Sequence, residues 1–220
     1  MYTITDLFDL THTKAVPLFE GKTYPYEVLD GIHDFILELG KTLPEDEYDH
    51  PAEDVWIAKD AKIFPNNYIA GPCIIGHKTE VRPGAFVRGN ALVGDGCVVG
   101  NSTELKNVIL FDAVEVPHYN YVGDSVLGFH AHMGAGAVTS NVKSDKLPVI
   151  IRDSEGNAVS TGRKKVGAAL GDYADIGCNT VLNPGTVVGR NSRVYPTSSV
   201  RGTVPARSVY KNKNDIVPIQ

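Results

Sequence analysis

Residues 55–105 read VWIAKDAKIFPNNYIAGPCIIGHKTEVRPGAFVRGNALVGDGCVVGNSTEL, with an aliphatic residue at every sixth position. Those positions are Ile57, Ile63, Ile69, Ile75, Val81, Val87, Val93, Val99 and Leu105. The residue two places before each of them is almost always small, as at Ala61, Ala85 and Ala91. A period of six fits neither a helix nor a plain strand. Each hexad therefore predicts one short strand and one corner, with the aliphatic side chain pointing inward.

The same register continues beyond residue 105 with two one-residue slips. It slips at Leu110 and at Leu127, runs on to Met133, and resumes at Leu170 after an interruption. It then reaches Val200, which makes twenty hexads in all. Three hexads close one triangular coil, so about six to seven coils should stack at the usual strand spacing of roughly 4.8 Å. The sequence predicts an all-β chain whose residues 53–205 form a parallel β-helix.

Three segments do not follow the repeat. Residues 1–52 place apolar residues at helical spacing between Tyr26 and Leu39, which predicts a small N-terminal helical cap and a linker into the first coil. Residues 139–165 interrupt the coils and are longer than an ordinary connection, which predicts a functional or disordered loop. Residues 206–220 lack the repeat and are expected to form a C-terminal tail.

The composition restricts the classes of function. The chain has 220 residues, of which 42% are hydrophobic and 21% charged, as is typical of a soluble globular protein. A net charge of −5 argues against a nucleic-acid partner, because binding duplexes requires a basic surface. No apolar run approaches the roughly 18 residues of a membrane span, and the first ten residues lack the pattern of a signal peptide. We therefore expect a cytoplasmic protein with free thiols and no membrane partner.

Basic residues gather where the repeat is irregular. Residues 139–165 carry six basic and three acidic side chains, and this local excess suits phosphates, although a solvated basic loop would have the same composition. Arg88 and Lys106 lie eighteen residues apart, so both follow an inward aliphatic residue on the same wall of neighbouring coils. Two like charges at that spacing repel unless an anion lies between them. This predicts a phosphate clamp, with a pair of solvated cations as the alternative.

Three histidines lie near the register slips. His118 follows Val116 by two residues and has two tyrosines close by in sequence. Imidazole is the side chain best suited to accept a proton at neutral pH, so His118 is a candidate general base, and a structural histidine is the alternative. His130 and His132 flank one alanine and should project the same way from a strand, as two metal ligands would. No third His or Cys accompanies them, so we expect no metal.

Three runs resemble a known family: GNSTELKN (100–107), VPHYNYVGDSVLG (116–128) and MGAGAVTSN (133–141). They are similar to the acetyltransferase half of the bacterial bifunctional N-acetylglucosamine-1-phosphate uridyltransferase/glucosamine-1-phosphate acetyltransferase. The run STGRKKVGAALGDYADIGCNTVLNPGTVVG (160–189) looks more like the archaeal sugar-1-phosphate nucleotidylyltransferase relatives. The resemblance extends over roughly residues 80–205. It implies a hexapeptide-repeat acyltransferase with a left-handed β-helix, assembled as a homotrimer with its sites between subunits.

The resemblance also implies roles for individual residues in binding the acceptor. His118 falls on the catalytic base of the family, and Tyr121 and Asn141 fall on residues that orient the sugar. Lys106 and Arg88 fall on contacts to the sugar phosphate.

Other positions would bind the coenzyme or complete the site. The backbone amide of Ala135 would hold the acetyl carbonyl, and Cys178 would lie near the thioester of coenzyme A. Lys146 is the nearest counterpart of the family's active-site loop lysine, and His132 stands where the bacterial family has Asn, so the identity of the sugar stays open. Three consecutive basic residues would meet the coenzyme phosphates: Arg163, Lys164 and Lys165.

Together these features predict an N-acetyltransferase that uses acetyl-CoA to acetylate an amino-sugar phosphate similar to glucosamine-1-phosphate. Residues 1–52 are too few for a nucleotide-binding α/β domain and carry no Gly-rich pyrophosphorylase fingerprint, so we expect no nucleotidyltransferase domain. Two other hypotheses remain. One is a non-catalytic β-helix that binds sugar nucleotides or partner proteins, and the other is a metal-dependent hydratase that uses His130 and His132.

Overall fold

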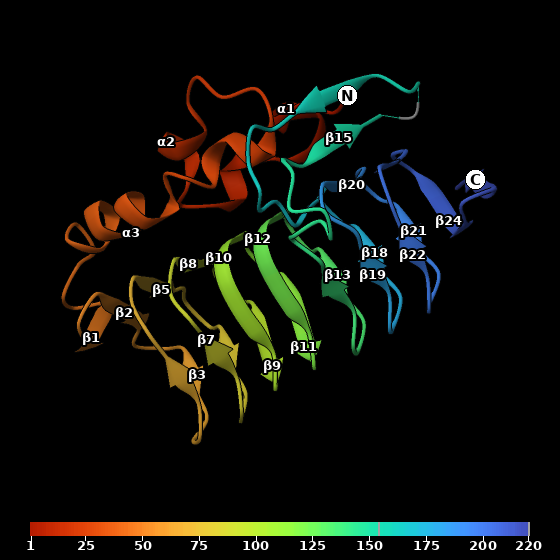
Figure 1. Ribbon diagram of the computed structural model, residues 1–220. Coiled ribbons are helices and arrows are strands. Elements are labelled where there is room, and N and C mark those ends of the chain that lie inside the picture. The colour runs from red at the N-terminus through yellow and green to blue at the C-terminus, as the bar shows by residue number, and fades with distance from the viewer. Residues whose placement is uncertain (154, 220) are drawn as a thin grey trace.

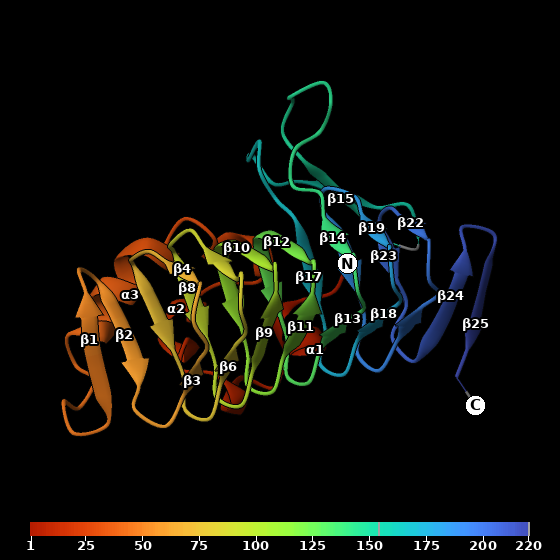
Figure 2. The same ribbon diagram turned by 90° about the horizontal axis from the view of Figure 1, so that it is seen from below.

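The computed structural model describes residues 1–153 and 155–219, and its main body is a prism of stacked coils (Figure 1). Strands three hexads apart pair in parallel, so Val55 aligns with Cys73, and Cys73 aligns with Ala91. The chain is a left-handed parallel β-helix, which confirms the predicted fold class. Figure 2 shows the coils following one another along the prism, from β1 at one end to β25 at the other.

Each coil contributes one short strand to each of three faces. The first face contains β2 (Val55–Ala58), β5 (Cys73–Ile75), β8 (Ala91–Val93), the second halves of β10 (Glu104–Leu110) and β12 (Tyr121–Leu127), β17 (Ala168–Leu170), β20 (Thr186–Val188) and β23 (Thr203–Val204). The second contains β3 (Lys62–Ile63), β6 (Glu80–Val81), β9 (Val98–Asn101), β11 (Glu115–His118), β13 (His132–Met133), β18 (Asp175–Ile176), β21 (Arg193–Val194) and β24 (Ser208–Asn212). The third contains β4 (Tyr68–Ile69), β7 (Phe86–Val87), the first halves of β10 and β12, β14 (Val138–Thr139), β19 (Val181–Leu182) and β22 (Ser199–Val200).

The corners of the prism recur with the period of the hexads. At most corners one residue adopts the left-handed backbone region, with φ of 55° at Lys78, 51° at Asn90 and 54° at Ser102. The two slips of register, at Leu110 and Leu127, follow corners at Asn107 and Asp124, where φ is 56° and 49°. At these two corners the strands β10 and β12 continue through the bend. The slips arise because these corners follow the preceding ones after five residues instead of six.

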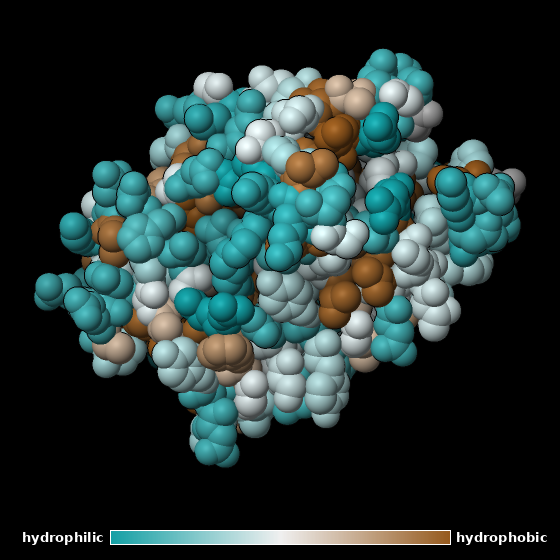
Figure 3. All heavy atoms as spheres, in the orientation of Figure 1, coloured by the Kyte–Doolittle hydropathy of each residue, from teal (hydrophilic) through white to brown (hydrophobic). Residues whose placement is uncertain are grey.

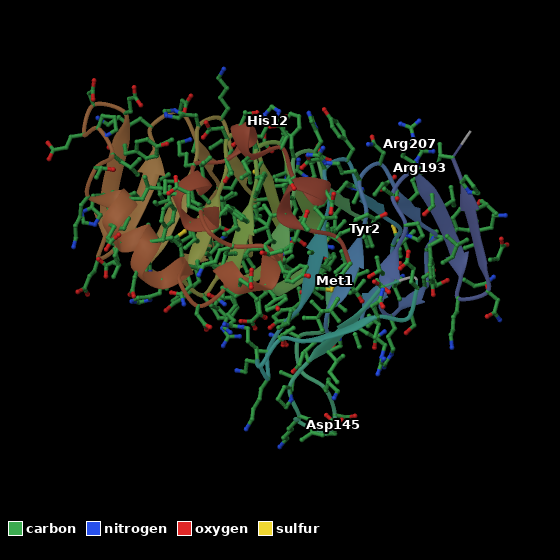
Figure 4. All side chains as sticks on the ribbon, turned by 90° about the horizontal axis from the view of Figure 1, so that it is seen from above. Met1, Tyr2, His12, Asp145, Arg193 and Arg207 are labelled. Carbon is green, nitrogen blue, oxygen red and sulfur yellow. The ribbon has the colours of Figure 1, made fainter. Side chains whose placement is uncertain are left out.

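The N-terminal segment runs back along one long edge of the prism, from its late coils to its first (Figures 1 and 4). The Tyr2 hydroxyl accepts a hydrogen bond from the Ala206 N–H (2.7 Å), and Gly40 packs against Trp56. The segment thus covers a flank of the prism. Its helical elements are α1 (Ile4–Leu7), η1 (Leu10–His12), α2 (Val16–Phe19), η2 (Pro25–Val28) and α3 (Ile32–Gly40).

The helix expected between Tyr26 and Leu39 is divided into a 3₁₀ turn, η2, and the helix α3. Gly31 lies at the break, and a Cβ there would come within 2.8 Å of the Leu18 side chain, so the chain turns where it crosses α2. Figure 3 shows this side of the molecule as largely hydrophilic, with hydrophobic residues in small groups. Within the residues described, no helix has the length and apolar character needed to cross a bilayer.

The two remaining segments are more regular than expected. Residues 139–165 contain an antiparallel hairpin of β15 (Ile150–Arg152) and β16 (Ala158–Ser160), whose buried Val149 and Ile151 lie against Gly185 of a late coil. At the C-terminus, β24 continues the second face, and β25 (Asp215–Pro218) pairs with it antiparallel. In the described chain the first and second faces each stack eight parallel strands. The prism is therefore longer than the six to seven coils expected, because β14, β23 and β24 add strands to the twenty hexads that were counted.

Candidate functional site

His118 lies at the corner between the second and third faces. The strand register places Ala135 and Cys178 at the same corner position in the next two coils. We call these three residues the open corner. Pro65, Pro83 and Asn101 hold this position in the earlier coils, and Pro196 holds it in the following coil. In three consecutive coils, the repeat thus has an imidazole, a methyl group and a thiol where the other coils have three prolines and an asparagine.

A hollow of about 400 Å³ lies beside the open corner on the second face. That volume is within the range of small-molecule sites. His118 and Cys178 are exposed there, and within the described residues the backbone N–H of Ala135 donates to no protein acceptor. The hollow therefore presents a base, a thiol and a hydrogen-bond donor to a ligand. It is lined by Arg82, Val98, Glu115, Pro117, His118, His132, Gly134, Ala135 and Cys178.

Asn120 fixes the geometry of the open corner, and it was not predicted. Its side chain is buried, and its Oδ1 accepts a hydrogen bond from the His118 N–H (3.1 Å). Its Nδ2 donates to the carbonyls of Gly134 (2.9 Å) and Ala137 (3.1 Å) in the next coil. One amide thus links the backbone of His118 to that on either side of Ala135. A pattern could have revealed it, because Asn120 occupies the small inward slot two residues before Val122.

A second group of polar residues surrounds Asp124, at the corner between the third and first faces. The carboxylate of Asp124 is buried and accepts hydrogen bonds from Lys106 Nζ (3.0 Å), Asn107 Nδ2 (2.9 Å) and Asn141 Nδ2 (2.5 Å). Asn141 Nδ2 also donates to the Tyr121 hydroxyl (3.2 Å). The structure thus brings together three predicted residues, Tyr121, Asn141 and Lys106. It does so through an aspartate that sequence reasoning missed.

Tyr121 lies flat over its own strand, because a Cβ at Gly123 would overlap its hydroxyl. Burial raises the pKa of Tyr121, and the charges of Asp124 and Glu104 raise it further. The hydroxyl therefore keeps its proton across the physiological range. Since its oxygen accepts from Asn141, its O–H is left to donate to a ligand.

Arg88 and Lys106 are neighbours, as the spacing predicted, because the register aligns Leu105 with Val87 just before them. Each has a carboxylate partner. Arg88 Nη1 lies 2.7 Å from Glu104 Oε1, and Lys106 Nζ lies 3.0 Å from Asp124 Oδ1. The two cations are therefore compatible without an anion between them. A phosphate at this place would have to compete with both carboxylates.

The basic residues of the interrupting segment do not form one cluster. Lys146 is exposed at a tip that extends away from the prism, where Figure 4 labels its neighbour Asp145. Arg163 is mostly buried and forms an ion pair with Asp30 of the N-terminal segment. Its neighbours Lys164 and Lys165 are exposed. The ion pair between Arg163 and Asp30 holds the N-terminal segment to the interrupting segment.

His130 and His132 do not share a direction, contrary to the alternation expected of a strand. His130 lies at a corner with φ of 56°, and its ring stacks on Tyr173. His132 lies on β13 and pairs through Nδ1 with Asp175 Oδ1 (3.0 Å). The corner conformation turns the first ring away from the second. In the described part of the chain, no group of three His, Cys, Asp or Glu side chains could hold a metal ion.

The coils and the open corner define a hexapeptide-repeat β-helix protein. Residues 69–212 match the family described as the GMPPB C-terminal domain, and the chain belongs to that family. A bifunctional sugar-1-phosphate nucleotidylyltransferase/acetyltransferase of Sulfurisphaera tokodaii is 32% identical over 157 residues, which cover 71% of this chain and 39% of that protein. A putative uncharacterized acetyltransferase of Escherichia coli, YaiX, is 28% identical over 77% of this chain and 73% of its own. The resemblance found in the sequence is thus confirmed.

The chain spans about two fifths of the length of the Sulfurisphaera tokodaii protein. Among solved structures, a UDP-N-acetylglucosamine acyltransferase of Francisella novicida is 13% identical with a TM-score of 0.43, covering 74% of this chain and 67% of that one. The acetyltransferase domain of PglB from Neisseria gonorrhoeae is 18% identical with a TM-score of 0.38, covering 88% of this chain and 66% of that one.

Proposed function

We propose that this chain is an acyltransferase of the hexapeptide-repeat kind that acts on a sugar, and that it transfers an acetyl group from acetyl-CoA to an amino-sugar phosphate. The open corner carries this proposal. It places an exposed imidazole, His118, in the same hollow as the thiol of Cys178 and the amide of Ala135, which is unpaired within the part of the chain that the structure describes. The names of two relatives, a bifunctional sugar-1-phosphate nucleotidylyltransferase/acetyltransferase and a putative acetyltransferase, support acetyl transfer.

The reaction needs a base, because an amine at neutral pH is largely protonated and an ammonium is not a nucleophile. In the proposed mechanism, the neutral imidazole of His118 takes the proton as the amine nitrogen attacks the thioester carbonyl. Such general-base help accelerates a reaction by about two to four decades. The carbonyl oxygen becomes an oxyanion, which would accept a hydrogen bond from the Ala135 N–H without reorganisation. Collapse of the intermediate breaks the C–S bond, and the coenzyme thiolate leaves and takes up a proton.

The sugar would be held on the third face, next to the open corner. There the Tyr121 O–H is left to donate to a sugar oxygen, and Asn141 fixes the tyrosine. Lys106 and Arg88 would bind the phosphate by exchanging their carboxylate partners for it. We also propose a cytoplasmic homotrimer, because flat faces allow three prisms to pack side by side and enclose the hollow beside His118.

The test uses the full chain with acetyl-CoA and a panel of amino-sugar 1-phosphates and nucleotide-linked amino sugars. Acetylated product should be measured by mass spectrometry, because the exposed Cys178 would react with a thiol reagent. We expect acetylation of at least one phosphorylated amino sugar. Product formation that is equal for all amines, including simple ones, would contradict a sugar site.

One observation favours the binding-protein alternative. Both proposed phosphate contacts are already neutralised, by Glu104 and Asp124, so the third face carries a charge-balanced surface suited to a partner protein. That alternative predicts that no amine on the panel is acetylated, while a partner protein, or a sugar nucleotide bound elsewhere on the coils, raises the thermal unfolding midpoint. An acetylated product would exclude it.

A further inference from the structure

A separate hollow of about 400 Å³ lies at the corner between the first and second faces, across the second face from the open corner. It adjoins a smaller hollow of about 150 Å³ and shares Tyr173 and Asn191 with it. Figure 4 shows Arg193 and Arg207 together on the long edge that also carries His12. The proposed acetyl transfer uses none of these residues. The larger hollow is lined by Tyr173, Asp175, Asn191, Arg193, Arg207 and Ile219.

The corner presents one aromatic ring beside an open space. The register places His130, Tyr173, Asn191 and Arg207 at the same position in four successive coils, all with left-handed φ between 53° and 59°. The rings of His130 and Tyr173 stack, with centroids 5.3 Å apart and planes 16° apart. His130 thus covers one face of Tyr173. On the other side, the side chain of Asn191 is small, so the space beside the ring stays open as the hollow. Tyr173 is 51% exposed.

The charges around this hollow favour an anion. Within the described residues, Arg193 and Arg207 form no ion pair. Asp175 is the carboxylate of the lining, and it is already paired with His132 on the neighbouring strand (3.0 Å). Arg190 of the smaller hollow is paired with Asp172 (2.7 Å), and Asp9 and His12 complete the titratable groups there. The larger hollow is therefore lined by two guanidinium groups and one carboxylate, Asp175, which is already paired with His132.

We propose that this hollow binds a nucleoside phosphate, with the base stacked on the open face of Tyr173 and the phosphates paired with Arg193 and Arg207. Aromatic stacking and guanidinium–phosphate hydrogen bonds are the two interactions that such ligands use. A volume of about 400 Å³ is in the range of a small-molecule site. A free nucleotide, a sugar nucleotide and the nucleotide part of coenzyme A share this chemistry. This proposal does not depend on the proposed acetyl transfer, because nucleotide binding is measured without any reaction.

The experiment is calorimetric titration of the full chain with ADP, adenosine 3′,5′-bisphosphate, GDP, UDP and inorganic pyrophosphate. We expect at least one nucleotide to bind more tightly than pyrophosphate, because the base adds stacking. Tyr173→Asn should weaken that nucleotide about 5- to 150-fold, which corresponds to the usual 1–3 kcal/mol of stacking. Asn is chosen because it tolerates the φ of 59° at this position. Arg193→Gln and Arg207→Gln should each weaken binding about tenfold.

Matched controls are Tyr195→Asn, which removes an exposed tyrosine outside the hollow, and Arg201→Gln, which removes an arginine of the third face. Both should bind as the unchanged protein does, and thermal unfolding midpoints show that all variants fold. Preference for adenosine 3′,5′-bisphosphate, with competition by coenzyme A, identifies the coenzyme as the source, and preference for UDP or GDP identifies a sugar nucleotide. Either result supports the site. Pyrophosphate binding as tightly as every nucleotide, no binding at all, or unchanged affinity in the Tyr173 and arginine variants overturns it.

Discussion

Two long edges of the prism are built from the same hexads and completed in opposite ways. At the edge between the first and second faces, here called the covered edge, Asp95, Asp112 and Asp172 each accept a backbone N–H from the preceding coil, at 2.9, 2.8 and 2.9 Å. The N-terminal segment adds Lys14 Nζ to Asp95 (2.6 Å) and the Asp9 N–H to Asp172 (2.7 Å). At the open corner, His118 and Cys178 are both exposed.

The difference separates stability from function within one repeat. At the covered edge, the carboxylates satisfy backbone donors that would otherwise lose their hydrogen bonds to water, and an unpaired buried group costs about 1–3 kcal/mol. At the open corner, the Ala135 N–H has no protein partner among residues 1–153 and 155–219, so it can bind a ligand. Substitutions of these three aspartates should therefore change folding, and substitutions at the open corner should change chemistry.

The largest expected contrast is in thiol reactivity. Burial raises the pKa of Cys97, beside the covered edge, to about 12, so only about one thiol in ten thousand is ionised at pH 8. Cys178 at the open corner is exposed. We expect iodoacetamide to alkylate Cys178 more than about a thousandfold faster than Cys97, as peptide mass spectrometry would show. Acetyl-CoA should slow the labelling of Cys178, and equal rates with and without it would place the coenzyme elsewhere.

The next effect concerns catalysis at the open corner. His118→Ala should lower kcat for acetyl transfer by about two to four decades, because the amine loses its base. The unfolding midpoint should stay unchanged, since the imidazole is exposed. His33→Ala, which removes an exposed histidine of α3, is the control and should keep full activity. Full activity of the His118 variant would remove the proposed base.

A third effect tests the covered edge. Asp172→Ala deletes a buried carboxylate that accepts from the N–H groups of Asp9 and Phe129 and pairs with Arg190 at 2.7 Å. We expect the free energy of unfolding in urea to fall by about 2–4 kcal/mol, with Arg190 able to turn partly into solvent. Asp215→Ala, which breaks an exposed ion pair with Lys211, should cost far less. Equal losses would mean that the covered edge contributes no special stability.

The smallest effect is the pH dependence of the Lys14 ion pair. Burial by itself lowers the pKa of Lys14, but the hydrogen bond and charge of Asp95 raise it by more. A lysine whose folded pKa exceeds its unfolded value of 10.5 stabilises the fold fully below that pH, and the contribution is lost as pH rises through the folded pKa. The difference in unfolding free energy between the unchanged protein and Lys14→Met should therefore be constant from pH 7 to 9 and shrink above about 10.5. It should not exceed about 1 kcal/mol, because the pair is partly exposed. A difference that grows with pH would contradict the ion pair.

The β-helix follows from the amino-acid pattern alone, because its cause is local. An inward aliphatic residue and a small neighbour recur every six positions, and each hexad forms its own strand and corner. The same period predicted that Arg88 lies beside Lys106, because residues one full coil apart in the sequence are neighbours on adjacent coils. The resemblance pointed to His118, Ala135 and Cys178, and the register stacks these three in consecutive coils.

The surroundings of those positions depend on long-range packing, because the contacts that define them join residues far apart in the chain. The path of residues 1–47 along a flank depends on contacts such as that of Tyr2 with Ala206, which no local period encodes. The pairing of Arg163 with Asp30 joins two segments outside the repeat. Asp124 joins Lys106 to Asn141 because three coils meet at one corner. A periodic sequence fixes distances along the coils, and packing between the repeat and its non-repeating segments decides which polar groups remain free to bind a ligand.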